Sequence, residues 1–450
     1  MRAGSTTRYQ QLSRHARPDK STSWGEGAPR KREFGAKVQQ GTPVEASWVL
    51  PWQEGRAAPP GRSVTIPYVP PFDPCYVPPA GNEAHLVFDD PWTGTTNLVF
   101  SCGDEDGPPA LVVVPIRRVY MQVNESSLWR IDGNVHIPTY SISMSLDVES
   151  WTWSFNASVP AEALADVEPE ADGVPAELEV RLNGMTFRVI AEGLSRDRTH
   201  ANSRISVRGR GKAAFLDAPY APIQNFGSDV DRTAQQLMAD VLTTNGVSIG
   251  WDIDWGLTDW LVPGGSWSGQ GTYIQGANTI AAAAGGYVQP HRTDQELRIL
   301  PRYPHAPWEW ATEVTPDFEL PAALAQREAI EWIEKVRYNR VFVQGQVNGV
   351  RGQVTRTGTA GDIVAQMVVD SLITHADAAR QRGLPVLADT GRQARVTIKV
   401  PVLDEIGVIE PGNFVRWVDG ATTRLGLVRS TSLEISHPEA WQSLLLETHT

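Results

Sequence analysis

Two Asn-Gly pairs, each lying between runs of alternating apolar and polar residues, limit most strongly how this chain of 450 residues can fold. Asn183-Gly184 follows "AELEVRL" and precedes "MTFRVIAEGLSRD", and Asn348-Gly349 lies in a second stretch of the same kind. Asn-Gly favours the tight turn that joins adjacent antiparallel strands, and a period of two is typical of strands with one buried face. The sequence therefore predicts β-hairpins in two well-separated regions.

Helical patterns occur between and within these β regions. "DRTAQQLMADVLTTNG" places apolar residues on one helical face, and Gly246 is expected to end that helix. A second helix is predicted over 273–284, and a hairpin follows it. The stretch 362–383 predicts the longest helix, which Gly383 is expected to end.

The order of these patterns predicts an α+β fold that is mainly β. Proline-rich sequence before it favours an extended segment, since proline is excluded from helix interiors and central strands. The predicted segments are a basic, flexible arm (1–37), a Pro-rich extended arm with short strands (38–115), a first β domain (116–218), an α+β insert (219–335) and a second β domain with one long helix (336–450).

The net charge of −12 conceals an asymmetry along the chain. Residues 1–37 contain nine Lys/Arg and three acidic residues, a balance of +6, which leaves −18 for the remainder. An acidic body disfavours general nucleic-acid binding. The basic arm could contact nucleic acid or an acidic partner, or it is a solvated arm that orders on a partner.

The chain has no apolar run long enough to span a bilayer, and residues 1–37 have no secretory signal. We therefore expect synthesis in a cytoplasm and no stable membrane insertion. Cys75 and Cys102 have neither a CxxC motif nor a nearby His pair, so no zinc site is expected. They are either unpaired thiols or a single disulfide.

An aromatic stripe runs through "DVESWTWSFNASVP", where Trp151, Trp153 and Phe155 occupy every second position. If the stretch is a strand, the three rings share one face. A sugar-binding platform, a surface that stacks nucleic-acid bases, and the packing seam of a β domain all use such a face. The inner face of a barrel or sandwich, or an interface, explains it most simply.

The strongest candidate for catalysis is "WDIDWGLTDW". Paired carboxylates between aromatic walls are what a glycosidase cleft requires, and Asp-x-Asp could also hold a divalent metal. An alternating strand with its Trp side chains inward and its Asp side chains in solvent explains the same pattern without chemistry. The residues of the hypothetical glycan site are Trp251, Asp252, Asp254, Trp255, Asp259 and Trp260.

Other catalytic motifs give no support for an enzyme. The sequence contains neither G-x-S-x-G nor HExxH, and "GGSWSGQG" lacks the Lys-Ser/Thr of a phosphate-binding loop. We therefore expect no catalytic residue, no metal and no cofactor.

Several of these stretches together resemble the central hub proteins of phage tails and related injection systems. They are "VESWTWSFNASVP" with the hairpin after it, "NTIAAAAGGYVQPHRTDQELRILPRYP", and "VTIKVPVLDEIGVIEPGNFVRW". Leu300-Pro301-Arg302 is similar to the Arg-Pro-Arg-like end of a hub hairpin, and 409–415 is similar to the L-x-P-G-D-x-V turn that opens a late barrel strand. The resemblance covers about 115–450. Residues 1–110 do not match and resemble an added arm that clasps neighbouring proteins.

The resemblance implies a structural protein of the virion that makes a homotrimer. Each copy would contribute two tube-like β-barrel domains to a ring that adapts a six-fold tail tube to a three-fold tip. The implied partners are the tail tube or distal tail protein, the tape-measure protein, and spike or receptor-binding proteins, with DNA as passing cargo. The protein would be assembled in the host cytoplasm and located at the tail tip.

The interface residues expected from this role are aromatic: Trp151, Trp153 and Phe155 in the first barrel, and Phe414 and Trp417 in the second. We expect their substitution by Ala to prevent assembly more than folding. The alternative function is a carbohydrate-binding or glycan-hydrolysing tail-tip protein that uses residues 251–260.

Overall fold

The computed structural model describes residues 111–117, 119–120, 122–170, 173–199 and 202–449. The predictions for the basic arm, for nearly all of the Pro-rich arm, and for Cys75 and Cys102 lie outside these residues. The expected fold class, α+β and mainly β, is confirmed. No helix among the described residues is long and apolar enough to cross a membrane.

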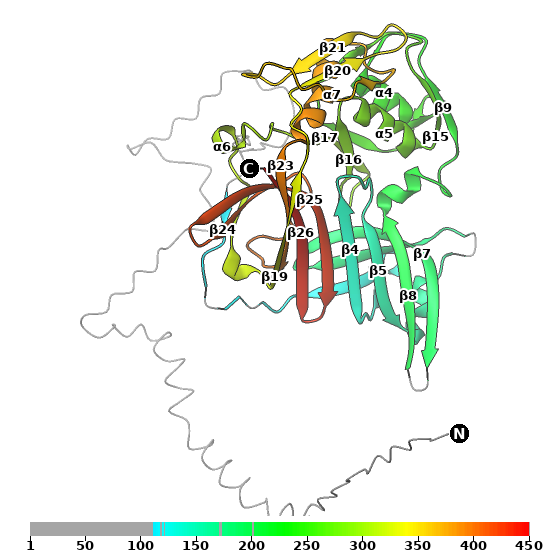
Figure 1. Ribbon diagram of the computed structural model, residues 1–450. Helices are drawn as coiled ribbons and strands as arrows, with labels where there is room; N and C mark the ends of the chain where they lie inside the picture. Colours follow the sequence, from blue (N-terminus) through cyan, green and yellow to red (C-terminus); the bar gives the residue numbers. More distant parts are fainter. Residues whose placement is uncertain (1–110, 118, 121, 171–172, 200–201, 450) are drawn as a thin grey trace, which may run out of the picture. The chain divides into compact units, whose positions relative to one another are not determined.

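One sheet of 14 strands forms the base of the fold (Figure 1). Its main path runs through β1 (Val112–Val113), β18 (Phe318–Pro321), β24 (Phe414–Asp419), β25 (Thr422–Ser436), β4 (Ser141–Asp147), β5 (Ser154–Pro160), β8 (Asn202–Gly211), β7 (Met185–Thr199), β6 (Ala176–Leu182), β2 (Ser126–Arg130) and β3 (Val135–Ile137). Off this path, β26 (Glu439–His449) pairs with β25 and β23 (Arg392–Pro401), and β23 pairs with β19 (Arg327–Glu334).

The first half of this sheet, β2 to β8, encloses its own core. The predicted Asn183-Gly184 hairpin joins β6 to β7, with φ of 48° and 80° at the two turn residues. Alternate residues of each strand are buried, as the period of two predicts. Leu433 and Ile435 of β25 join the same core, so strands from the C-terminal region complete the first half.

The second half consists of β1, β18, β19 and β23 to β26 around another core. Val396, Ile398 and Val400 of β23 alternate inward and contact Trp417, Leu444 and Leu446. Antiparallel pairing of β25 with β4 joins the two halves into one sheet, as the red and teal strands of Figure 1 show.

A β-bulge between Val428 and Ser430 lets β25 serve both cores. Val428 pairs with Leu446, and Leu433 pairs with Gln442, four residues away on β26. Without the bulge, the five-residue step from Val428 to Leu433 would point their side chains to opposite faces. The extra residue restores the alternation, so both side chains lie on the core side of the sheet.

An α+β region built around its own apolar core lies next to this sheet. Its helices are α4 (Ala234–Val241), which starts at a capping box of Thr233 and Gln236, and α5 (Tyr273–Ala283). The predicted hairpin after α5 is confirmed as β16 (Gly286–Pro290) and β17 (Glu296–Pro301), with β13 (Asp252–Trp255) parallel to β17.

Short elements complete the described chain. The predicted Asn348-Gly349 hairpin is confirmed between β20 (Arg340–Gln344) and β21 (Arg351–Thr355), with β22 (Val368–Val369) beside β20. The remaining strands are β9 (Gln224–Gly227), β10 (Arg232–Thr233), β11 (Thr243–Thr244), β12 (Val247–Ser248), β14 (Leu261–Val262) and β15 (Ser268–Gly271). The remaining short helices are α3 (Leu164–Val167), α6 (Trp310–Glu313), η2 (Asp132–Asn134), η3 (Ala161–Ala163), η4 (Lys212–Leu216) and η5 (Ala322–Leu324).

The longest predicted helix differs from its expected position. It is α7 (Ala376–Ala388). Its N-cap is His375, whose side chain accepts a hydrogen bond from the Asp377 backbone N–H. The preceding stretch is rich in β-branched residues, which favour strands, and it forms β22 and loops. Gly383 lies inside the helix instead of ending it. A Cβ at this position would come within 2.5 Å of Val354 Cγ2, so close packing of α7 against β21 accounts for a glycine there.

Gly246 does not end α4 either. The helix ends at Val241, and Asn245 and Gly246 take positive φ values of 52° and 79° in the turn between β11 and β12. Asn-Gly is thus again a hairpin turn.

The expected domain boundaries stay predictions, and two contacts in the structure cross them. Sheet pairing connects β18 and β19 to strands that follow residue 392 in the sequence. Residues between 341 and 387 share an apolar core with residues between 213 and 299.

Candidate functional site

The two motifs that carry the family resemblance meet in the structure. Glu410, in the turn at 409–415, accepts hydrogen bonds from Arg292 and Arg298 of the β16–β17 hairpin region. The Arg298 contact measures 2.6 Å, and the Glu410 side chain is only 10% exposed. The contact therefore ties the α+β region to the turn that opens β24.

Neighbouring hydrogen bonds fix the same turn. Gln289 Nε2 and the Tyr287 hydroxyl both donate to the Pro411 carbonyl, at 3.0 and 3.3 Å. Burial raises the pKa of Tyr287 to about 12, so its hydroxyl keeps its proton. Burial alone would raise the pKa of Glu410, but the charges and hydrogen bonds of its two arginines outweigh burial and lower it.

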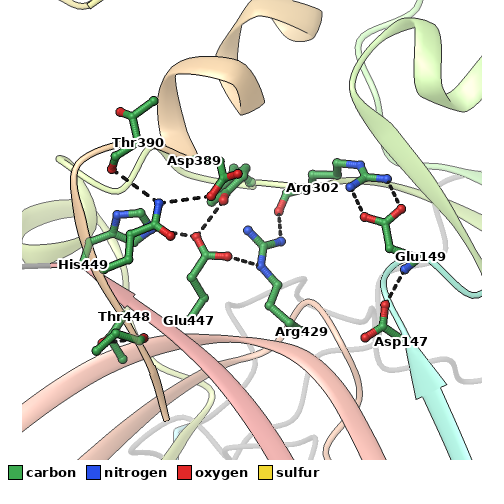
Figure 2. A network of polar contacts seen from close by, with 12 residues as sticks. Asp147, Glu149, Arg302, Asp389, Thr390, Arg429, Glu447, Thr448 and His449 are labelled. Atoms are coloured by element: carbon green, nitrogen blue, oxygen red, sulfur yellow. Dashed lines mark hydrogen bonds and ion pairs between the residues drawn. The ribbon is translucent and has the colours of Figure 1, made fainter. Parts of the chain in front are cut away.

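A second polar network joins the α+β region to the strands β25 and β26. Glu447 accepts hydrogen bonds from Arg429 (2.7 Å), Tyr303 (2.6 Å) and the His449 ring (2.7 Å). Arg429 also donates to the Arg302 carbonyl at 2.6 Å. Figure 2 shows Arg429 between the Glu447 carboxylate and Arg302.

Burial governs the electrostatics of this network. Burial alone would raise the pKa of Glu447, but its hydrogen bond with His449 and the charge of Arg429 lower the pKa to about 2. Burial also raises the pKa of the Tyr303 hydroxyl far above its ordinary value, which keeps it a hydrogen-bond donor. Glu447 is therefore a charged acceptor at neutral pH, held by three donors.

A cavity of about 770 Å³ adjoins this network between the sheet and helices α5 and α7. On its rim Arg302 makes a bidentate ion pair with Glu149, as Figure 2 shows. The carboxylates on the cavity wall are thus engaged by neighbouring side chains or backbone. This arrangement is suited to holding two parts of the chain together.

The sheet face that points away from the cores carries two rows of serine. In the first row, Ser443, Ser432, Ser145 and Ser154 are consecutive register partners across β26, β25, β4 and β5. The row crosses the junction of the two halves, and Ser145 and Ser154 hydrogen-bond through their hydroxyls at 2.6 Å.

The second row runs across β4, β5, β8 and β7. Its members are the register partners Ser141, Ser158, Ser206 and Ser195. All eight serines are exposed or partly exposed. Strands are normally enriched in β-branched and aromatic residues, so folding alone does not call for two rows of small hydroxyls. We call these eight residues the serine face.

Charges at the ends of the first row are neutralised. Lys399, beside Ser443, pairs with Glu434 at 2.5 Å, and Arg210, beside Ser154, pairs with Glu192 at 2.7 Å. The row therefore offers hydroxyls that both donate and accept hydrogen bonds, with its flanking cations already paired.

The aromatic residues expected at interfaces lie inside the chain. Trp153 (2% exposed), Phe155 and Trp417 (both 1%) are enclosed by the cores of the two halves. Phe414 is buried against Trp310, with ring centroids 5.3 Å apart. Trp151 is half-buried below Arg210 and contacts the core of the α+β region.

This burial changes the expected effect of substituting them. A side chain almost fully covered by its own chain has little surface to offer a second copy. The expectation that Ala at Trp153, Phe155 or Trp417 prevents assembly stays a prediction, and the burial of these side chains leads us to expect a loss of folding stability as well. The stripe is also not one strand face, because β5 starts only at Ser154.

The hypothetical glycan site has the arrangement of an alternating strand. Asp252 and Asp254 are exposed on β13, whereas Trp251 and Trp260 are buried. The Trp260 indole donates to the Leu372 carbonyl at 2.9 Å, and Trp255 contacts Trp260. Asp259 accepts a hydrogen bond from the Gln235 backbone N–H at the start of α4. A glycan role for these residues stays a prediction.

Sequence reasoning missed the serine face and the Glu447 network. Serine alternates with apolar residues in "SISMS", and "RSTSLEIS" contains three further serines. Their alignment into rows depends on strand register, which is a tertiary property. Glu447 and Arg429 gave no such signal.

Neither the family models nor the curated proteins compared with the sequence give a match. Among solved structures, the tail protein from Neisseria meningitidis MC58 is similar with a TM-score of 0.51 at 17% identity, over 72% of this chain and 97% of that one. The 43 kDa tail protein of prophage MuSo2 from Shewanella oneidensis gives 0.47 at 13% identity, over 72% and 96% of the chains. Prophage tail protein gp18 from Listeria monocytogenes gives 0.48 at 14%, over 71% and 94%. The expected resemblance to phage tail proteins is thus confirmed for the fold.

Proposed function

We propose that this chain is a structural protein of a phage tail tip, where three copies form a ring that joins the tail tube to the distal tip. The fold shared with the N. meningitidis tail protein supports a place in a tail. The continuous sheet supports the ring, because one copy already holds two β halves side by side. Three copies place six halves around an axis, which matches a six-fold tube.

The observation that carries this proposal is the serine face, which spans the junction of the two halves. In the ring this face lines the channel through which DNA passes during host entry. Neutral hydroxyls displace no counterions from phosphates, so they give a polyanion no electrostatic reason to stay. Along the first row small side chains also leave a flat wall, whereas the exposed Arg204 and Arg208 flank Ser206 of the second row on the same face of β8.

The two polar networks have a mechanical role in this proposal. Ion pairs of Glu410 with Arg292 and Arg298 fasten the α+β region to the turn before β24. At a second place, Glu447 and Arg429 of the sheet hold the segment after β17 through the Tyr303 hydroxyl and the Arg302 carbonyl. Breaking a buried ion pair costs about 3–5 kcal/mol, so these links resist displacement when the ring contacts its neighbours.

The proposed neighbours are the tail tube or distal tail protein on one side and the spike or receptor-binding proteins on the other. The tape-measure protein and DNA occupy the channel. The protein is assembled in the host cytoplasm, works in the virion and catalyses no reaction.

The first experiment is light scattering of the purified chain behind a sizing column. We expect a species at three times the 49.4 kDa of one chain, alone or after addition of the tail tube protein. A chain that stays monomeric in both samples would contradict the ring.

A further inference from the structure

Three arginines converge on a small cavity, and none of the eight residues of the serine face is among the described residues that line it. The cavity has a volume of about 290 Å³ and lies where the segment after β19, the end of β21 and the start of β23 meet the loop before α6. We call it the arginine pocket, and its principal lining residues are Trp308, Arg337, Arg356, Thr390, Arg392 and His449.

The arginines of this pocket lack counter-charges. No ion pair joins Arg337, Arg356 or Arg392 to any described residue, and no carboxylate is among the described residues that line the cavity. Glu334 is the register partner of Arg392 in β19, but it does not line the cavity. In contrast, Arg292, Arg298, Arg302 and Arg429 all pair with glutamates.

These three arginines gather at one cavity of a chain whose body is acidic. Residues 38–450 carry a net charge of −18, so acidic partners for arginine are abundant along the sequence. Like charges that converge without a counter-ion repel one another, and a bound anion would relieve this repulsion.

The side chains that line the pocket indicate which chemical groups it can bind. Arg356 lies over the Trp308 ring at 4.6 Å, so its guanidinium plane is held by stacking. Arg337 and Arg392 are exposed and present guanidinium groups, which match carboxylates with two parallel hydrogen bonds. Thr390 lies on the same wall.

We propose that the arginine pocket binds the carboxylate side chains of an acidic peptide segment from another protein. A cavity of this volume holds one or two side chains and is too small for a nucleic-acid strand. The net acidic charge of the body also opposes a polyanionic duplex, whereas a short acidic segment meets only the local positive charge. The site does not depend on the ring or on the serine face.

The test uses the full chain and a fluorescein-labelled hexaglutamate peptide, with binding followed by fluorescence anisotropy. The double variant Arg337→Gln/Arg392→Gln should bind at least about tenfold more weakly, since charge-assisted hydrogen bonds are lost. Arg327→Gln, an exposed arginine of β19 that does not line the pocket, is the matched control and should bind as the natural chain does.

A second double variant and two other anions distinguish the proposed ligand from alternatives. Arg337→Lys/Arg392→Lys keeps the charge but loses the planar fork, and we expect intermediate binding. Inorganic phosphate should compete only weakly, and a short single-stranded oligonucleotide should not bind the pocket. The proposal is overturned if the natural chain fails to bind the peptide, if the double Gln variant binds it equally well, or if only the oligonucleotide binds in a pocket-dependent way. Light scattering of the same samples reports the ring separately.

Discussion

Arg298 donates a hydrogen bond to Glu410 over 2.6 Å and so joins β17 of the α+β region to the turn that opens β24. Arg292 approaches the same carboxylate from the hairpin turn. Two segments far apart in the sequence therefore depend on one buried carboxylate for their alignment.

Glu410→Gln should lower the free energy of unfolding by about 3 kcal/mol, because it leaves two arginines without their shared counter-charge. Urea unfolding followed by circular dichroism measures this. Glu434→Gln is the control, since its pair with Lys399 is exposed and such pairs contribute about 0–1 kcal/mol. Equal effects of the two substitutions would show that Glu410 is not a structural link.

Stability should depend on pH through Glu447. Its folded-state pKa of about 2 lies below the ordinary 4.5, so its contribution is fully present above pH 4.5 and is lost as pH falls towards 2. The difference in pKa corresponds to roughly 3 kcal/mol. We expect Glu447→Gln to remove this part of the pH dependence. Unfolding of both chains measured across this range gives the difference, and parallel curves would contradict the prediction.

Gly383→Ala should destabilise the chain by about 1–3 kcal/mol through overpacking. The added Cβ would lie 2.5 Å from Val354 Cγ2 and 2.8 Å from Val354 Cβ. Combining it with Val354→Ala should restore part of the loss, because the clashing methyl groups are removed. Purely additive unfolding energies would show that Val354 is not the obstacle.

Trp153→Ala and Trp417→Ala should each cost about 3–5 kcal/mol of folding stability, since both rings are buried in cores. Thermal unfolding reports this directly. Trp332→Ala is the control, because that ring is 64% exposed. If the core variants melt at the natural temperature yet fail to assemble, the original interface expectation holds instead.

Lysines placed on the serine face should make it retain DNA. A triple variant with Ser145→Lys, Ser154→Lys and Ser432→Lys should bind duplex DNA in low salt, with affinity falling steeply as salt rises. The corresponding threonine variant keeps the hydroxyls and should behave as the natural chain does. Tails assembled with the lysine variant should release DNA more slowly, and unchanged release would remove this face from the channel.

Local patterns predicted the elements whose formation depends on neighbouring residues. Asn183-Gly184 and Asn348-Gly349 form the expected hairpins, and α5 matches its predicted span closely. The long helix was predicted to start too early, because the β-branched residues before Ala376 form β22 and loops, and it was predicted to end at Gly383, which lies inside α7 in close contact with Val354.

The sequence by itself determined the mainly β character, the hairpin turns and the inward positions of each strand, because these follow from backbone preferences and a period of two. Only the tertiary structure decided which strands became neighbours. Register aligned eight serines from six strands into two rows, and chain packing brought Glu410 to Arg298 and Glu447 to Arg429. Such contacts join residues more than a hundred positions apart in the case of Glu410, and no local pattern records them. Their formation depends instead on the sum of burial, hydrogen bonding and charge over the whole folded chain.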